Sequence, residues 1–488
     1  MSNIAKIAST FSLTPTVGPT LILGRAILFA ILVFLLKFLL TKRQSSKTQE
    51  PFGVPAKQAE YVTTFPPSQR SALRDILRNA SCVSGTDDPT VLARNVLDLN
   101  AHYRSADPSK LIFTGFSVGE IRALGNFPDY AKLSGVPLPT PVFDFDLKKA
   151  LPRPYRPFRW AYHQTMSLKR LEPDYWIEIE NKYAKRIKQR QEIYAKHGKD
   201  VLNALSGSEL ACKEIMEMAL QFVCARYPRQ FELVDGNRTL VNHILNTRDD
   251  LAKKDPLLVL LDNIPEDFCM MLRDPTTGMY CFRAGIICSS VGWYLGDKMG
   301  LGMPAIHKTV PDYKEKMEFS MDRFFTQMPT DKPIQRGSWA FEIGEPLYLP
   351  PHDPEFNNRN HQEQSLRPED ISLRVDWQTL RRLPLSGAVV FNFKALFTPI
   401  TEFRNERYVP SLILKVLSEG NEAILKYKST WHVEHVIKPT LVEYERYQKE
   451  NGLMNKNWEP ETLAESPFFP GWEDKWKLST AHVDASIF

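Results

Sequence analysis

The sequence lacks the cysteine pairs of metal-binding modules. None of its six cysteines stands in a CxxC pair, so neither a zinc ribbon nor an iron–sulfur centre is indicated, and reduced, buried thiols are expected. A Gly-rich phosphate loop, a GxSxG nucleophile elbow and a catalytic-cysteine motif are missing as well. The common nucleotide-binding and hydrolase functions therefore have no support. The cysteines are Cys82, Cys212, Cys224, Cys269, Cys281 and Cys288.

A strong excess of one charge is also missing. The 62 Lys and Arg residues against 57 Asp and Glu residues give a formal net charge of +5, which is small for 488 residues and indicates no nucleic-acid partner. The hydrophobic content of 43% is high enough for a substantial buried core. A chain of this length holds about two to four domains of ordinary size, and most of it is expected to fold.

One long apolar run stands near the N-terminus. Residues 21–40, LILGRAILFAILVFLLKFLL, have roughly the length that spans the hydrocarbon core of a bilayer. Arg25 and Lys37 lie near its ends, where long cationic side chains reach the interface. Basic residues follow the run within 42–47, so the positive-inside rule places the rest of the chain in the cytosol. A single-pass membrane anchor is predicted. The alternative, a cleaved signal peptide, has a shorter apolar region and a cleavage site that is not evident here.

The chain divides into six predicted segments. Polar, proline-rich sequence follows the apolar run, as in a tether. Short helical patterns precede the main domain, in which a long helical stretch is predicted to begin near Pro173 and a last amphipathic helical region runs from Val409 to Lys449. The segments are an N-terminal tail (1–20), the anchor (21–40), a linker (41–70), a helical extension (71–140), the main domain (141–450) and a C-terminal tail (451–488).

Strand patterns fill the main domain from about Asp267 to Ile400. DFCMMLRD and MYCFRAGIICSS flank the turn-forming stretch 275–278 and predict a β-hairpin. A helix should follow in VPDYKEKMEFSMDRFFTQM, capped by Thr309 and with Pro311 in its first turn. SWAFEIG, ISLRVDWQTLRRLP and GAVVFNFKALF predict three more strands. The order predicts an α+β fold, with an antiparallel sheet and helices packed on one side of it.

A lone histidine, His307, precedes the predicted helix. The positive end of a helix dipole would disfavour the imidazolium form, and a metal ion needs a neutral imidazole. A structural, hydrogen-bonding histidine is the alternative. On the strand that follows, alternation puts Arg374, Asp376 and Gln378 on one face, where they could line a polar pocket or simply meet solvent.

Other polar patterns indicate different chemistry. Arg336 and the Arg381–Arg382 pair could bind the carboxylates of a cofactor by paired hydrogen bonds, although ordinary surface ion pairs explain them equally well. Asp144 and Asp146 form the DxD pattern with which many glycosyltransferases hold a divalent cation. A further pattern, whose spacing is not that of HExxH, offers three possible metal ligands on one helix: His432, Glu434 and His435.

Five blocks of sequence resemble, in order and spacing, the haem-dependent oxidative N-demethylase family, including its fungal members. The resemblance covers about residues 140 to 440. It implies a haem-binding PAS-like domain, which agrees with the strand, helix and strand order, and an oxidoreductase that uses haem and O2 to oxidise a small amine-like substrate. The blocks are PYRPFRWAYHQTMSLKRLEPDYWIEIENKY, EDFCMML, GWYLGDKMGLGMPAIHKTVPDY, RFFTQMPTDKPIQRGSW and LRVDWQTLRRLPLSGAVVFNFKALFTPI.

The resemblance also implies partners. In that family, electrons arrive through a flavin and an iron–sulfur centre, and neither motif appears here, so a separate NADPH-dependent reductase is implied. Such a flavoprotein could reach a domain anchored on the cytosolic face of the endoplasmic reticulum membrane. One alternative is a haem or ligand sensor with the same PAS-like body and no turnover. Another is a glycosyltransferase that uses the DxD pattern.

Site residues follow from the same resemblance. PAS haem proteins carry the axial histidine on or beside the helix before the last three strands, a place that His307 fits, with His163 as its competitor. Arg336, Trp339 and Arg381 become candidate cofactor contacts. Arg374, Asp376 and Gln378 are expected to polarise oxygen and orient the substrate, and the Asp376 carboxylate is expected to deliver protons.

The sequence departs from the family at two places near the expected pocket. Asp376 and Trp377 stand where the family usually carries Glu and Arg, and Ser338 stands where it usually has Asn. A shorter carboxylate and a lost guanidinium would change how an amine or bound oxygen is held. Dimethylamine is therefore not expected as the substrate.

Overall fold

The computed structural model describes residues 64–70, 94–163 and 165–480 of the chain. These residues belong to one compact unit, which begins at Lys57. The predicted tail 1–20 and anchor 21–40 lie outside the described residues, as does most of the linker. Among the residues that are described, no helix is both long enough and apolar enough to cross a bilayer.

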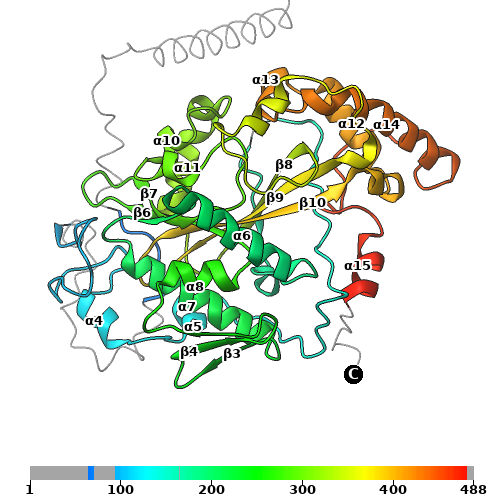
Figure 1. The fold of residues 1–488 in the computed structure, drawn as a ribbon. Coiled ribbons are helices and arrows are strands. Elements are labelled where there is room, and N and C mark those ends of the chain that lie inside the picture. The colour runs from blue at the N-terminus through cyan, green and yellow to red at the C-terminus, as the bar shows by residue number, and fades with distance from the viewer. Residues whose placement is uncertain (1–63, 71–93, 164, 481–488) are drawn as a thin grey trace, which may run out of the picture. The chain divides into compact units, whose positions relative to one another are not determined.

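A seven-stranded antiparallel sheet forms the centre of the described unit (Figure 1). The predicted hairpin is present as its β6 and β7, and the three later predicted strands are β8, β9 and β10. The predicted hairpin and the three predicted strands are confirmed, because alternating apolar residues bounded by turns strongly favour strands. In spatial order the strands are β1 (Lys169–Arg170), β8 (Ile334–Ile343), β9 (Ile371–Arg382), β10 (Val389–Pro399), β6 (Asp267–Arg273), β7 (Tyr280–Ile286) and β2 (Leu202–Ala204).

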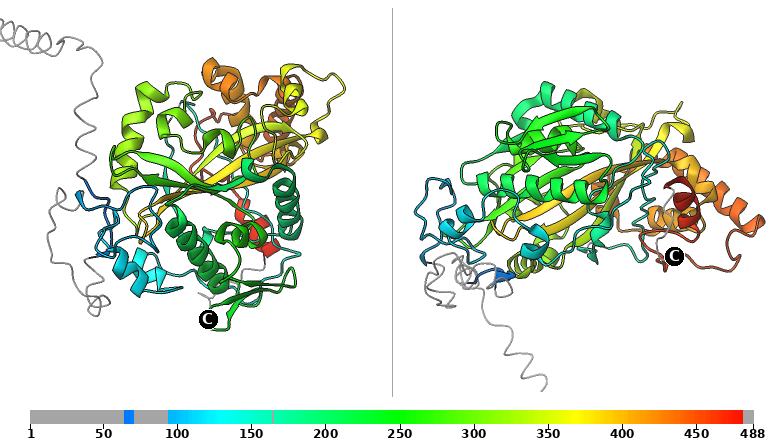
Figure 2. Two further views of the ribbon diagram at one scale, coloured as in Figure 1. Left: turned by 60° about the vertical axis from the view of Figure 1, so that its left-hand side comes forward. Right: turned by 90° about the horizontal axis from the view of Figure 1, so that it is seen from below.

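Helices cover both faces of this sheet, not one face as predicted (Figures 1 and 2). We call one side the α7 face, where α6 (Tyr183–His197), α7 (Glu209–Arg226) and α8 (Pro256–Asn263) pack. The other is the α11 face, covered by α9 (Leu295–Lys298), α10 (Met303–Ile306) and α11 (Glu318–Gln327). The one-sided expectation was wrong because β9 is buried on both sides, although alternate residues along it are polar.

Two predicted helix starts are displaced. The stretch at Pro173 makes only a 3-10 turn, Pro173–Tyr175, and the long helix α6 begins later. The helix after His307 opens with one π-helical turn, Tyr313–Met317, and then continues as α11. Asp312 takes a left-handed conformation with φ 56° just before that turn, so Thr309 and Pro311 stand outside the helix and cap nothing.

The remaining elements surround the sheet. A small meander carries three short strands, and the predicted C-terminal helical region is divided into three helices. The five cysteines in the described part of the chain are free, and three of them are buried. The elements are α4 (Val118–Ala123), α5 (Tyr130–Ser134), β3 (Phe231–Val234), β4 (Thr239–Asn242), β5 (Thr247–Asp250), α12 (Val409–Glu419), α13 (Glu422–Tyr427), α14 (Trp431–Glu450) and α15 (Trp472–Thr480), with 3-10 turns at Gly198–Asp200, Pro354–Asn360, Pro368–Asp370 and Ile400–Asn405.

The predicted extension and C-terminal tail are joined to the main domain by a common core. Phe116 and Val118 of the extension are buried in the same apolar cluster as the α7 face of the sheet. Phe469, near the C-terminus, belongs to that cluster too. The whole α7 face is thus a continuous structural core.

Candidate functional site

His307 stands at the end of the short helix α10. Gly302 and Pro304 start this helix, and the His307 ring turns back to place Nδ1 2.8 Å from the carbonyl oxygen of Met303. Because a carbonyl only accepts, Nδ1 carries the hydrogen and Nε2 keeps its lone pair. The ring also stacks on Tyr313, with centroids 4.7 Å apart and planes 8° apart. The local fold thus fixes both the tautomer and the orientation of the imidazole.

The pKa of His307 is lowered, but the predicted cause was wrong. Burial is the largest cause, and the positive charges of Arg336 and Lys298 add to it, while the hydrogen bond to Met303 opposes it. The residue caps the C-terminal end of α10, where a helix dipole would favour the imidazolium. Desolvation and neighbouring cations, rather than the dipole, keep this imidazole neutral.

An apolar cluster rich in methionine and aromatic side chains surrounds His307 on the α11 face. Phe391 and Phe393 of β10 pack against it. Methionine side chains adapt to irregular shapes, and flat aromatic ligands are bound by such linings. We call it the methionine-rich cluster; its buried members are Cys269, Met271, Tyr280, Phe282, Ile287, Leu295, Met303, Tyr313, Met317, Met321, Phe325, Met328, Leu380 and Val389.

The polar row predicted on β9 shares the α11 face with His307. Gln378 pairs with Arg336 of β8, and Asp376 pairs with Ser338, so these four side chains lie on one face. Arg374 has its guanidinium committed: Nε donates to Asp376 Oδ1 at 2.9 Å, and the two terminal nitrogens donate to backbone carbonyls, including that of Ser289 at 2.5 Å. Arg374 therefore holds Asp376 in place and has no free donor evident for a ligand.

Arg336 is one of the cations of this face that have no carboxylate partner among the described residues. Its Nε is buried and has no hydrogen-bond partner among the described residues. Burial lowers its pKa, and Arg159 lowers it further, while the phenols of Tyr162 and Tyr427 oppose the effect. An unpartnered guanidinium in such a place is an unfavourable arrangement unless a ligand group completes it.

Two functional candidates were missed at the level of sequence. Arg159 lies in the loop before β1, and Lys428 directly follows α13, on the same side of the sheet as α10 and α11 (Figure 1). Lys428 Nζ donates to Ser338 Oγ at 2.7 Å. Burial, with Arg336 as the next cause, lowers the pKa of Lys428 to about 8. No motif could have found these residues, because nothing but the fold brings them beside β8.

His163 lies in the loop that Arg159 organises. Its side chain is exposed, and Nδ1 lies 3.0 Å from the carbonyl oxygen of Ala161. Arg159 donates to the His163 carbonyl at 2.5 Å and to Thr165 Oγ1 at 2.6 Å. Compared with His307, this imidazole has the same kind of backbone partner but no apolar surroundings of its own.

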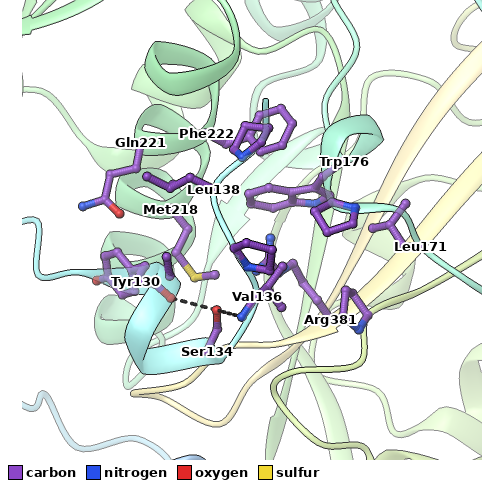
Figure 3. A pocket seen from close by; sticks show the side chains of 15 residues that line it. Tyr130, Ser134, Val136, Leu138, Leu171, Trp176, Met218, Gln221, Phe222 and Arg381 are labelled. Carbon is purple, nitrogen blue, oxygen red and sulfur yellow. Dashed lines mark hydrogen bonds between the residues drawn. The ribbon is translucent and has the colours of Figure 1, made fainter. Parts of the chain in front are cut away.

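Trp339 and Arg381 lie on the α7 face, whereas His307 lies on the α11 face, although the Trp339 ring also has Lys428 Nζ 5.6 Å from its centroid. Trp339 is 3% exposed and packs with Phe158, 4.9 Å away between centroids. Arg381 lies 4.1 Å over the Trp176 ring and lines a separate cavity with about 30 Å³ of free volume (Figure 3). Successive side chains of a strand point to opposite faces of the sheet. Trp339 and Arg381 each adjoin a residue that points to the α11 face, so both point to the α7 face. That both contact the cofactor stays a prediction.

The other predicted metal patterns do not converge. Asp144 is exposed and lies 3.8 Å from an exposed arginine, and Asp146 caps its own turn. His432 Nδ1 contacts the Ser429 carbonyl at 2.9 Å, whereas His435 Nε2 contacts the backbone of residue 363 at 2.9 Å. Among the described residues, no three His, Cys, Asp or Glu side chains gather as metal ligands. A haem iron needs only one or two such ligands.

Comparison with known families gives one match. A family model described as "Haem-dependent oxidative N-demethylase, alpha subunit-like" matches residues 167–438. The matched range contains the central sheet, both sets of covering helices, His307 and Lys428, but not Arg159 or His163. No curated protein matches the chain.

Proposed function

Because the chain belongs to the haem-dependent oxidative N-demethylase, alpha subunit-like family, we propose that it is an oxidoreductase that uses haem and O2 to remove a methyl group from an amine-like substrate. The family is haem-dependent. The reaction consumes an N-methyl amine, O2, two electrons and two protons, and it yields the demethylated amine, formaldehyde and water. In this proposal His307 Nε2 would hold the haem iron.

One observation carries the assignment, namely the hydrogen bond from His307 Nδ1 to the Met303 carbonyl. A metal-bound histidine generally donates its other ring N–H to a carbonyl or carboxylate, which fixes the ring and raises the basicity of the bound nitrogen. The methionine-rich cluster supplies the apolar surface that a porphyrin needs. The residues present therefore fit haem.

The strand order supports a PAS-like sheet. The five long strands lie in the order β7, β6, β10, β9, β8, so the first hairpin is joined to the last strand, with the helices of the α11 face between the hairpin and the last three strands. That is the arrangement expected of a PAS-like domain with a ligand between sheet and helices.

Haem supplies the activation of O2 when it is bound, and side chains of this chain would handle protons, water and orientation. Asp376 Oδ1 is held by Arg374, which leaves Oδ2 to hold and pass a proton. Gln378 can orient the substrate, while the methionine-rich cluster excludes water.

The electron source and the location complete the proposal. We propose a separate NADPH-dependent reductase as donor, since the sequence has no motif for a flavin or an iron–sulfur centre. Residues 21–40 would anchor the protein in the endoplasmic reticulum membrane with the catalytic domain in the cytosol. Protease treatment of intact microsomes should then digest the domain; full protection of the domain would contradict this orientation.

The ligand assignment is tested by absorption spectroscopy. The full-length chain, purified with haemin supplied, should show a Soret band that His307→Ala abolishes and that added imidazole restores, because imidazole can replace the missing ring. His163→Ala is the matched control and should keep the band. Circular dichroism reports whether each variant folds. A band retained in His307→Ala, or lost only in His163→Ala, would move the ligand; a folded, colourless wild-type protein would end the proposal.

A further inference from the structure

Three cationic side chains from separate parts of the chain gather at the β8 end of the α11 face. Arg159 comes from the loop before β1, Arg336 from β8, and Lys428 from the residue after α13. Arg159 and Arg336 each lower the pKa of Lys428, so all three charges act on one another. We call them the cationic cluster.

The hydrogen-bond partners of the cationic cluster are neutral. Lys428 Nζ donates to the hydroxyl of Ser338 at 2.7 Å. Arg159 donates to a threonine hydroxyl, a serine hydroxyl and a backbone carbonyl. Arg336 Nε is buried with no partner in the described part of the chain. Hydroxyls and carbonyls satisfy donors, but they do not balance charge.

The nearest carboxylates are already committed. Asp376 acts on Lys428 but accepts from Arg374 at 2.9 Å, so that pair carries no surplus negative charge. Glu342, further along β8, is paired with Arg359. The three partly buried cations therefore have no carboxylate partner of their own among the described residues, an arrangement that an added anion would stabilise.

The cationic cluster adjoins the proposed reaction site and is open to solvent at its edge. Arg336 and the methionine-rich cluster around His307 lie on the same face of the sheet, and the charge of Arg336 lowers the pKa of His307. At the rim, the side chain of Asp376 is 34% exposed and Tyr427 is 44% exposed. Solvent thus reaches the rim of the cationic cluster.

Resting on the proposed function, we propose that Arg159, Arg336 and Lys428 bind a carboxylate of the substrate, so that the preferred substrates are N-methyl amines that carry a carboxylate. Charge-assisted hydrogen bonds from guanidinium and ammonium groups suit a carboxylate. Simple cationic amines are repelled by the same three charges. The propionates of a porphyrin offer the same chemistry, so the test must separate the two sources.

Binding of three probes to the full-length chain tests the proposal. N-Methylglycine carries the carboxylate, its methyl ester lacks that charge, and dimethylamine lacks the whole group. The haem-loaded protein should bind N-methylglycine about tenfold or more tightly than the ester or dimethylamine, as expected for charge-assisted hydrogen bonds. Calorimetry measures the affinities. Equal binding of the three probes would overturn the proposal.

Variants assign the effect to the cationic cluster. Lys428→Met should abolish the preference for N-methylglycine, and Lys428→Arg should restore it in part. Lys426→Met, an exposed lysine on α13, is the matched control and should change nothing. A Soret titration follows haem affinity, which should be unchanged in Lys428→Met. If instead haem affinity falls and the probe preference remains, the cluster binds porphyrin propionates and the proposal fails.

The same calorimetry on haem-free protein separates this proposal from the proposed function. The cationic cluster is formed by protein side chains alone, so a preference for N-methylglycine over its ester should persist without haem. Failure of haem loading would then contradict the proposed function and leave this measurement intact. Loss of the preference in both forms would overturn the carboxylate site while the haem assignment stands.

Discussion

The two faces of the central sheet differ in their apolar packing, although both bury polar groups. On the α7 face, Glu214 of α7 is fully buried and accepts hydrogen bonds from the backbone of Leu385 and Ser386, at 2.5 and 2.7 Å. Lys394 of β10 lies 3.9 Å from Glu266. Buried polar atoms without a partner in the described residues occur on both faces: Arg381 Nε and Trp176 Nε1 on the α7 face, and Arg336 Nε and the Tyr313 hydroxyl on the α11 face.

The apolar packing of the two faces differs in size and composition. The α7 face joins many aliphatic and aromatic side chains into one large cluster, whereas the α11 face has a smaller cluster with methionine at five of its fourteen buried positions. Branched aliphatic residues lock into one arrangement, while methionine adapts. We infer that the α7 face stabilises the fold and that the α11 face is adapted to bind a ligand.

A cavity cut into the α7 face gives the largest expected effect. Leu260 of α8 is fully buried in that cluster, so Leu260→Ala should lower the free energy of unfolding by roughly 2–5 kcal/mol. Urea denaturation measures it. Leu138, which is 53% exposed, provides the control: Leu138→Ala should stay within about 0.5 kcal/mol. Similar losses in the two variants would break the contrast between core and surface on this side.

Titration of a buried carboxyl group on the α11 face should change the free energy of unfolding by an intermediate amount. Asp322 of α11 is 8% exposed and its Oδ1 has no partner among the described residues. Burial, helped by the charge of Glu318, raises its pKa from 3.8 to about 7. The folded state therefore keeps this proton where the unfolded state has lost it, so the contribution to stability falls between about pH 4 and pH 7 and is constant above.

Asp322→Asn removes this dependence. Relative to the wild type, the variant should gain roughly 1–3 kcal/mol of unfolding free energy between pH 4 and pH 8, less than full linkage would give because water reaches a buried carboxylate. Thermal or urea unfolding across that range measures the difference. Parallel profiles for wild type and variant would contradict the prediction, because they would show that burial on the α11 face does not perturb this carboxyl.

The substitutions with the smallest expected change in stability test whether only the α11 face binds haem. Met321 of α11 and Met216 of α7 are each 4% exposed, and replacement of either by leucine conserves volume, so stability should change by less than about 1.5 kcal/mol. Only Met321→Leu should weaken haem binding, because only that side chain belongs to the methionine-rich cluster. A Soret titration compares the two variants. Equal haem affinities would show that methionine has no special part on the α11 face.

The sequence predicted the sheet better than its surroundings. The hairpin, the three later strands and the side of Arg374, Asp376 and Gln378 could be predicted because strand alternation is local and strict. Helix positions were less certain: Thr309 and Pro311 look like a helix start, but a left-handed Asp312 delays it. The neutrality of His307 was expected for the wrong reason, since burial and Arg336 lower its pKa.

Only those features of the site that depend on a single segment of the sequence could be predicted. Arg381 and Trp339 were assigned to the cofactor from their residue types, yet strand alternation turns both to the α7 face. Lys428 and Arg159 were missed because they meet Arg336 only after distant parts of the chain fold together. Contacts between residues that are far apart in the sequence cannot be predicted from their local sequence.

By itself, the sequence determined the family, the antiparallel strands and the histidine worth testing, because these depend on residue order and on the two-residue period of a strand. Only the tertiary structure decided which cations stand beside that histidine and which lack a counter-ion. Burial and charge balance are properties of three-dimensional neighbourhoods: a lysine or arginine becomes a binding group when packing removes water from it and leaves its charge unmatched.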